Sequence, residues 1–225
     1  MARSVIVTGG FGILGQAVAR AFARNGDKVA RVDFASAAPD QQATLDIGGV
    51  DLTDPASTQD ALDKVIAAHG GLDVLVNVAG GFTWETLEGG SIDAWVRMQS
   101  MNLLTGATIT KLALPALKAA AAGRVVNIGA GAAAKAAAGM GAYTASKSGV
   151  HRLTEALADE LSGTAVTVNA VLPSTIDTPT NRADMPDADF GGWVQPSAVA
   201  DVILFLASPQ ARAISGALIP VTRGG

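Results

Sequence analysis

The sequence predicts an α/β fold in which helices cover both faces of a doubly wound, mostly parallel sheet. Short β-branched runs alternate with helical patterns along the whole chain, and the strand candidates are apolar on both faces. No linker or shift in composition divides the 225 residues, a length that can form one substantial core. We therefore expect one domain spanning residues 1–225.

The first half of the chain alternates strands and helices from its beginning. Strands are expected over residues 4–8, 28–33 and 74–77, where Val and Ile predominate. Helices are expected over residues 12–25 and 55–69. Because a helix precedes each of the later strands, we expect parallel strands joined by right-handed crossovers.

The second half continues this alternation. Its expected elements are, in order, a long helical stretch over 91–121, a strand over 124–128, a helix over 143–161, a strand over 165–171, an irregular segment over 173–195, a helix opened by Pro196 and a strand over 217–221. The alanine-rich region 116–138 can end a helix, since alanine favours helices. Four glycines make its later part and the residues that follow a flexible loop, which we expect beside the active site: Gly129, Gly131, Gly139 and Gly141.

Composition excludes several classes of function. The chain carries 16 Lys+Arg against 20 Asp+Glu, so a nucleic-acid partner is not expected. It has no cysteine and two histidines, which argues against a metal site. No apolar run approaches the roughly 20 residues of a membrane span, and the N-terminal run is too short for a signal peptide. We expect a cytoplasmic protein with no membrane partner.

A glycine-rich turn follows the first expected strand. Gly9, Gly10, Gly12 and Gly15 allow a tight turn whose backbone N–H groups can approach a pyrophosphate at a helix N-terminus. Asp33 ends the second strand, 18 residues after Gly15, where a carboxylate can bind the adenosine ribose hydroxyls of a dinucleotide. An acid at this place repels a 2′-phosphate, so NAD is expected in preference to NADP.

Tyr143 and Lys147 lie one helical turn apart on the expected helix 143–161. A phenol with an ordinary pKa near 10 is a poor acid or base at neutral pH. A nearby ammonium stabilises the phenolate and lowers that pKa, which would make Tyr143 a usable general acid or base.

These pieces together resemble the short-chain dehydrogenases/reductases from end to end, which are Rossmann-like enzymes. The resemblance implies the strand order 3-2-1-4-5-6-7, catalytic roles for Tyr143, Lys147 and Asn102, and a proton-relay water held by Asn102. It also implies a homodimer or homotetramer and a small-molecule substrate. The residues implied to bind the cofactor are Gly9, Phe11, Gly12, Ile13, Leu14, Gly15, Asp33, Asp51, Leu52, Asn77, Ala79, Gly80, Lys147, Pro173, Thr175 and Thr178.

The chain departs from that family at one catalytic position. The family's Ser stands 13 residues before the Tyr, and here that residue is Ala130. Three interpretations stay open: a substrate that needs no polarising hydroxyl, a replacement hydroxyl from Ser174 or Thr175, or lost activity.

A narrower resemblance favours the first interpretation. Residues 79–82, 139–143 and 171–190 together with Trp193 are similar to quinonoid dihydropteridine reductases, a family that also lacks the Ser and uses NADH. It implies a pterin-like substrate, which gains aromatic stabilisation on accepting hydride. The candidate substrate residues are Phe82, Trp84, Ala130, Met140 and Trp193. The alternatives are a carbonyl or alcohol dehydrogenase and a catalytically silent NAD-binding protein.

Overall fold

The computed structural model describes residues 2–42 and 44–223, and its strands form one seven-stranded sheet. The strands are β1 (Ser4–Thr8), β2 (Lys28–Val32), β3 (Leu45–Ile47), β4 (Val74–Asn77), β5 (Arg124–Ile128), β6 (Thr167–Pro173) and β7 (Leu218–Val221). Neighbouring strands are parallel throughout, in the order β3-β2-β1-β4-β5-β6-β7. The predicted sheet and its order are confirmed. Met1, Ala43 and Gly224 with Gly225, which the predicted domain includes, lie outside the described residues.

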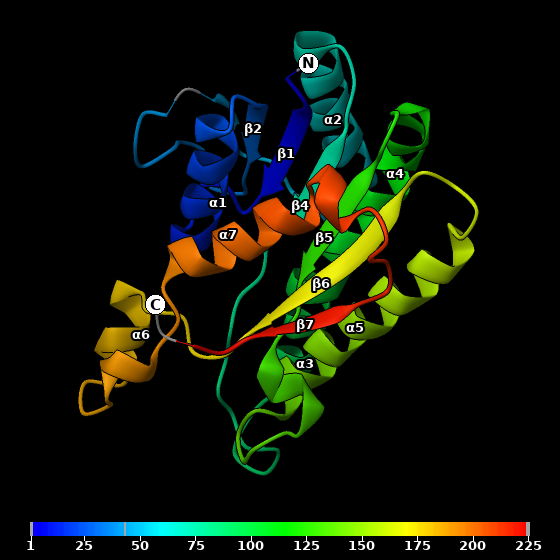
Figure 1. The fold of residues 1–225 in the computed structure, drawn as a ribbon. Coiled ribbons are helices and arrows are strands. Elements are labelled where there is room, and N and C mark those ends of the chain that lie inside the picture. The colour runs from blue at the N-terminus through cyan, green and yellow to red at the C-terminus, as the bar shows by residue number, and fades with distance from the viewer. Residues whose placement is uncertain (1, 43, 224–225) are drawn as a thin grey trace.

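Helices cover both faces of this sheet (Figure 1). They are α1 (Ile13–Arg24), α2 (Pro55–His69), α3 (Ile92–Gln99), α4 (Thr105–Ala119), α5 (Gly141–Glu160), α6 (Pro179–Asp184) and α7 (Pro196–Leu206). Side chains of α1 and α7 pack against one face, and side chains of α2, α4 and α5 pack against the other. Alternate side chains of each strand therefore point into two apolar cores, one on each face of the sheet, as expected for a doubly wound sheet. No helix in the described ranges is long and apolar enough to cross a membrane.

The edge strand β3 is not indicated by the local sequence pattern. It has three residues, of which Asp46 is exposed, so it lacks the apolar run that marks the other strands. A buried guanidinium holds it in place: Arg31 of β2 donates to both carboxylate oxygens of Asp46, at 2.8 and 2.7 Å, and to Asp40 at 2.6 Å. Arg31 is completely buried and its guanidinium lies over the ring of Phe11. The charge cluster thus joins the β2–β3 region to the glycine-rich turn.

The predicted helical stretch over 91–121 contains a change of helix type. Helix α3 passes into a five-residue π-helical turn, Ser100–Leu104, and then into α4. A π-helical turn places an extra residue in the helix, and such turns occur frequently at functional sites. Asn102 lies in this turn and is buried.

The segment over 173–195 is more ordered than the irregular stretch that the sequence predicts. It contains α6 and a 3-10 turn, Phe190–Gly192, and a bridge joins Ile176 to Val194. The guanidinium of Arg182 donates to both oxygens of Asp177, at 2.6 and 2.7 Å, and lies over the Phe190 ring. These hydrogen bonds lower the pKa of Asp177 to about 2. The Pro and Asp residues of this segment cap short turns, which explains why its pattern reads as irregular.

Candidate active site

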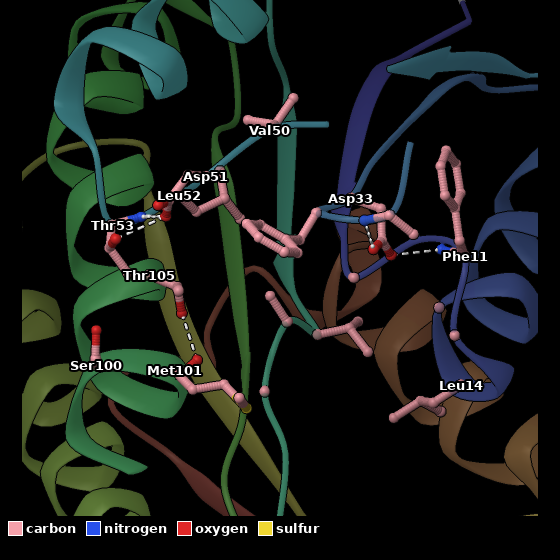
Figure 2. A pocket seen from close by; sticks show the side chains of 18 of the residues that line it. Phe11, Leu14, Asp33, Val50, Asp51, Leu52, Thr53, Ser100, Met101 and Thr105 are labelled. Atoms are coloured by element: carbon pink, nitrogen blue, oxygen red, sulfur yellow. Dashed lines mark hydrogen bonds between the residues drawn. The ribbon is translucent and has the colours of Figure 1, made fainter. Parts of the chain in front are cut away.

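A cleft of about 1160 Å³ opens at the carboxyl ends of the strands. In Figure 2, Phe11, Leu14 and Asp33 lie on one side of it, while Ser100, Met101 and Thr105 lie across from them. Its described lining includes Gly9, Phe11, Gly12, Ile13, Leu14, Gly15, Asp33, Phe34, Val50, Asp51, Leu52, Val78, Ala79, Gly80, Val96, Arg97, Met101 and Thr178. Ligands of open parallel sheets bind at this edge, so the cleft is the candidate cofactor site.

The glycine-rich turn is shaped for close approach. Gly9 has a φ of 60°, which a residue with a side chain rarely adopts. A Cβ on Gly15 would overlap the carbonyl oxygen of Gly9, so the helix packs directly on the turn. Helix α1 begins at Ile13, and the glycine before it, Gly12, gives no side-chain cap, so the first N–H groups of the helix suit a pyrophosphate. The turn fits a dinucleotide by its own geometry.

Asp33 is held at the end of β2 by two backbone groups. Its Oδ2 accepts the N–H of Phe11 at 2.9 Å, and its Oδ1 accepts the N–H of Ala35 at 3.0 Å (Figure 2). Both oxygens keep a lone pair for hydroxyl groups. Among the described lining residues Arg97 is the only Lys or Arg, and it belongs to α3.

The wall that Asp51 and Leu52 form is fixed locally. The N–H and the hydroxyl of Thr53 donate to Asp51 Oδ1 at 2.8 and 2.6 Å, which lowers the pKa of the Asp51 carboxyl. Leu52 is buried and its neighbour Val50 lines the same cleft. An apolar slot beside a fixed carboxylate is compatible with an adenine ring.

Several predicted cofactor residues lie elsewhere. The side chain of Asn77 is buried and donates to Thr110 at 2.9 Å and to Asn127 at 2.9 Å, which links β4 to α4 and β5. Neither Asn77, Pro173 nor Thr175 is among the described lining of the cleft. The Asn77 amide therefore links strands and a helix of the core, and a contact of Asn77 with the cofactor stays a prediction. Conversely, Phe34, Val96 and Met101 line the cleft and were not predicted, because no local motif marks them.

Tyr143 and Lys147 lie on α5, as the sequence predicts. The ammonium of Lys147 donates to the carbonyl oxygen of Ile128 at 2.8 Å, and burial lowers its pKa to about 8. A Cβ on Gly80 would lie 3.5 Å from that nitrogen, so Lys147 lies beside the cleft wall. Burial raises the pKa of Tyr143 to about 12. The expected lowering of the Tyr143 pKa is not found: burial raises it, and the ammonium of Lys147 is directed at the Ile128 carbonyl.

The amide of Asn102 is committed to protein partners. Its Oδ1 accepts the N–H of Gly81 at 2.8 Å, and its Nδ2 donates to the Gly81 carbonyl at 3.1 Å and to Ser146 Oγ at 2.9 Å. Ser146 in turn donates to the carbonyl of Tyr143 at 2.7 Å. Asn102 thus connects the segment after β4 to the turn of α5 that carries Tyr143. The expectation that it holds a relay water stays a prediction.

The candidate substrate residues divide into two groups. The Phe82 ring meets Tyr143 edge to face with centroids 4.9 Å apart, and Trp84 packs on Gly139, yet both rings are more than half exposed. Met140 is half-buried and precedes the first residue of α5. Trp193, in contrast, is buried against Phe190, 4.7 Å between centroids, and packs the base of segment 173–195. Among these described side chains, the ring of Phe82 is the one that contacts the ring of Tyr143.

Ala130 is buried beyond the end of β5, and its N–H is donated to His151 at 3.3 Å. Ser174 is exposed directly after β6. Pro173, the residue before Ser174, lies close to Gly131, because a Cβ on Gly131 would be 3.6 Å from the Pro173 carbonyl oxygen. The end of β6 therefore approaches the segment in which the hydroxyl is missing.

Comparison with known proteins identifies the family. A model of the short chain dehydrogenase family matches residues 3–189. This chain belongs to the short chain dehydrogenases. It is 33% identical to cis-4-hydroxycyclohexanecarboxylate dehydrogenase of Sinomonas cyclohexanicum over 99% of this chain and 96% of that protein. It is 30% identical to D-beta-hydroxybutyrate dehydrogenase of Rhizobium meliloti over 91% of this chain and 83% of that protein.

A solved structure agrees with this assignment. Ligand-free aldohexose dehydrogenase of Thermoplasma acidophilum superposes with a TM-score of 0.90 at 28% identity, covering 98% of this chain and 92% of that one. This short chain dehydrogenase is accordingly an oxidoreductase of a family that binds NAD(P). The narrower resemblance to dihydropteridine reductases is not shown by these comparisons and stays a prediction.

The titration of Tyr143 tests the electrostatics of this short chain dehydrogenase directly, because the chain has a single tyrosine. We expect its phenolate absorbance to develop well above the ordinary pKa of about 10, near the value of about 12 that burial produces. The folded state then keeps a proton that the unfolded chain loses, so Tyr143 lowers stability as the pH rises above roughly 10. Ultraviolet absorbance measures the formation of the phenolate, and circular dichroism measures the loss of folded protein as the pH rises. The Tyr143→Phe variant is the control without a phenolate. Phenolate formation at or below the ordinary pKa would contradict the burial argument.

Proposed function

We propose that this short chain dehydrogenase is an NADH-dependent reductase of a ring substrate, with a dihydropterin as the first candidate. The observation that carries the proposal is the exposed ring of Phe82, which meets Tyr143 edge to face, with the exposed ring of Trp84 packed on Gly139 of the loop that precedes the Tyr143 helix. Exposed aromatic rings next to a reacting group favour a flat substrate, since ring contacts supply both area and orientation.

The chain's own groups support reduction. The phenol of Tyr143 is protonated at neutral pH, which is the form that donates a proton to a reduced substrate. Lys147 lies beside Gly80 and would hold the nicotinamide ribose, while Asp33 and the glycine-rich turn would hold the adenosine and pyrophosphate. When bound, the nicotinamide cofactor supplies the hydride. Tyr143 Oη gives the accompanying proton to the substrate, and Phe82 limits the approach of water to that oxygen.

Ala130 supports a dihydropterin in particular. A ketone needs its carbonyl oxygen polarised, and the methyl group of Ala130 cannot donate a hydrogen bond to it. A dihydropterin is already electron-poor and gains aromatic stabilisation when it accepts hydride. The absence of a hydroxyl at residue 130 is therefore less costly for this substrate.

A second candidate is an alicyclic alcohol or ketone. The relative from Sinomonas cyclohexanicum is named for a hydroxycyclohexane carboxylate, and this name favours an alicyclic substrate. Ser174, exposed where the end of β6 approaches Gly131, supports it as the source of a replacement hydroxyl.

We also propose a cytoplasmic location and a homodimer or homotetramer. The exposed side chain of Leu104 in the π-helical turn supports an association surface. These two expectations stay predictions.

The function is tested by NADH oxidation with a dihydropterin freshly made by oxidising a tetrahydropterin, beside alicyclic ketones, aldehydes and quinones. We expect the dihydropterin to be reduced fastest. Tyr143→Phe should lower that turnover at least about 100-fold with NADH binding retained, because it removes the proton donor. Full activity of Tyr143→Phe would overturn the mechanism, reduction of ketones alone would favour the second candidate, and NADH binding without any turnover would indicate a silent protein.

Cofactor preference follows from Asp33. We expect Asp33→Asn to lower the ratio of kcat/KM with NADH to kcat/KM with NADPH by at least about tenfold, since a charge opposite a 2′-phosphate is removed. The amide oxygen can still accept the Phe11 N–H, whereas the amide nitrogen loses the bond from the Ala35 N–H, so kcat/KM is measured with each cofactor separately and a gain with NADPH reports the charge. Asp201→Asn on α7 is the matched control, because Asp201 is exposed and lies outside the cleft lining. An unchanged ratio would remove Asp33 as the determinant.

The missing hydroxyl can be restored. If the site serves a dihydropterin, Ala130→Ser should leave its reduction within about threefold and ketones should remain poor substrates. A site built for carbonyls should instead gain roughly a hundredfold in ketone reduction, the worth of one well-placed donor. Steady-state rates with both substrate types distinguish the two, and Ala132→Ser controls for adding a hydroxyl nearby.

A further inference from the structure

The imidazole of His151 lies between α5 and the end of β5, one helical turn after Lys147. It is 5% exposed, and its Nε2 accepts the N–H of Ala130 at 3.3 Å. The proposed function gives this histidine no role. Its partner, however, is the residue that stands where the catalytic hydroxyl is missing.

Gly129 provides the space for this imidazole. A Cβ at residue 129 would lie 2.5 Å from His151 Nε2 and 2.8 Å from its Cδ2, distances that real side chains do not adopt. The φ of Gly129 is not positive, so its backbone conformation does not require glycine. The glycine is therefore explained by space, and Gly129 and His151 form a matched pair.

His151 belongs to a row of contacts between α5 and β5. Lys147 donates to the Ile128 carbonyl at 2.8 Å, and Thr154 Oγ1 accepts from Asn127 Nδ2 at 2.9 Å. Lys147, His151 and Thr154 are spaced by four and three residues, so they share one face of the helix. Together they hold the strand end one turn away from Tyr143.

We propose that neutral His151 is a positioning residue that fixes Ala130, and with it the substrate-facing end of β5, against the helix that carries Tyr143. Only a neutral imidazole has an acceptor nitrogen for the Ala130 N–H. When His151 is protonated, its Nε2 carries a hydrogen that faces the Ala130 N–H. The hydrogen bond is then lost, and Ala130 is no longer held against the helix. The enzyme should lose turnover in acid for this reason.

The charged groups that act on His151 belong to its own helix. Burial and the positive charges of Arg152 and Lys147 hold the pKa of His151 below its ordinary value, while Glu155 opposes them. Strand β6 and the 3-10 turn Gly131–Ala134 contain no ionisable residue, and Arg124, the one in β5, lies at the opposite end of that strand. The acid loss should consequently fall below the ordinary histidine pKa of about 6.5.

The test compares the wild type with His151→Gln, His151→Leu and Asp159→Asn, an exposed control on α5. One readout is the phenolate titration of the single tyrosine, which needs no substrate. The other is kcat against pH with the fastest substrate of the panel, and this readout alone rests on the proposed function. We expect His151→Leu to shift the Tyr143 titration and to lower kcat by roughly ten- to a hundredfold, as a misplaced site does.

The His151→Gln variant distinguishes a role of the hydrogen bond to Ala130 from a role of the size of the side chain. Its amide oxygen can accept the Ala130 N–H without titrating, so kcat should stay within about threefold of wild type and the acid loss should disappear. Wild-type behaviour of His151→Leu in both readouts, or an acid loss retained in His151→Gln, would overturn the proposal.

A double-mutant cycle checks the pairing without activity. Gly129→Ala should lower the Tm, and His151→Ala should restore part of that loss in the double variant by vacating the space. Additive effects on Tm would contradict the matched pair. If the wild type reduces no substrate, the proposed function fails, and the Tyr143 titration and this cycle still decide the role of His151.

Discussion

The end of the molecule that we propose to be catalytic depends on the buried ammonium of Lys147. Among the described residues, its hydrogen-bond partner is a neutral group, the carbonyl oxygen of Ile128. A buried cation without a carboxylate is costly unless the surrounding structure fixes it. The cost is met by the packing of α5 on the sheet, which also fixes Tyr143 one turn earlier. Gly80 lies beside Lys147 and must lack a side chain because a Cβ there would lie 2.5 Å from Asn102 Oδ1.

The two ends of the cleft follow different physical rules. At the end proposed to bind adenosine, carboxylates are fixed by short bonds: Asp33 to backbone N–H groups and Asp51 to Thr53. At the end proposed to react, the Phe82 ring contacts Tyr143, and burial makes the Tyr143 phenol a weaker acid than in water. Binding energy from the polar end can thus orient a substrate at the apolar end, where charge is expensive to create.

Much of this arrangement is visible in the sequence. Strand order, the glycine-rich turn, Asp33 and the pairing of Tyr143 with Lys147 follow from local patterns and from the family resemblance. β3 escapes the pattern because a buried charge cluster around Arg31, rather than an apolar run, holds it. The π-helical turn around Asn102 cannot be predicted, because no residue type in it distinguishes it from an ordinary α-helix. The inward direction of the Asn77 amide depends on Thr110 and Asn127, which are distant in the sequence.

Arg31 also limits how the adenosine end can be re-engineered. The region between β2 and β3 supplies the counter-charges of a guanidinium that is completely buried behind the glycine-rich turn. A replacement loop without an acid at residue 40 would leave Arg31 without one of its partners. A successful loop exchange must therefore keep or replace all three charged residues at once, because Arg31, Asp40 and Asp46 depend on one another.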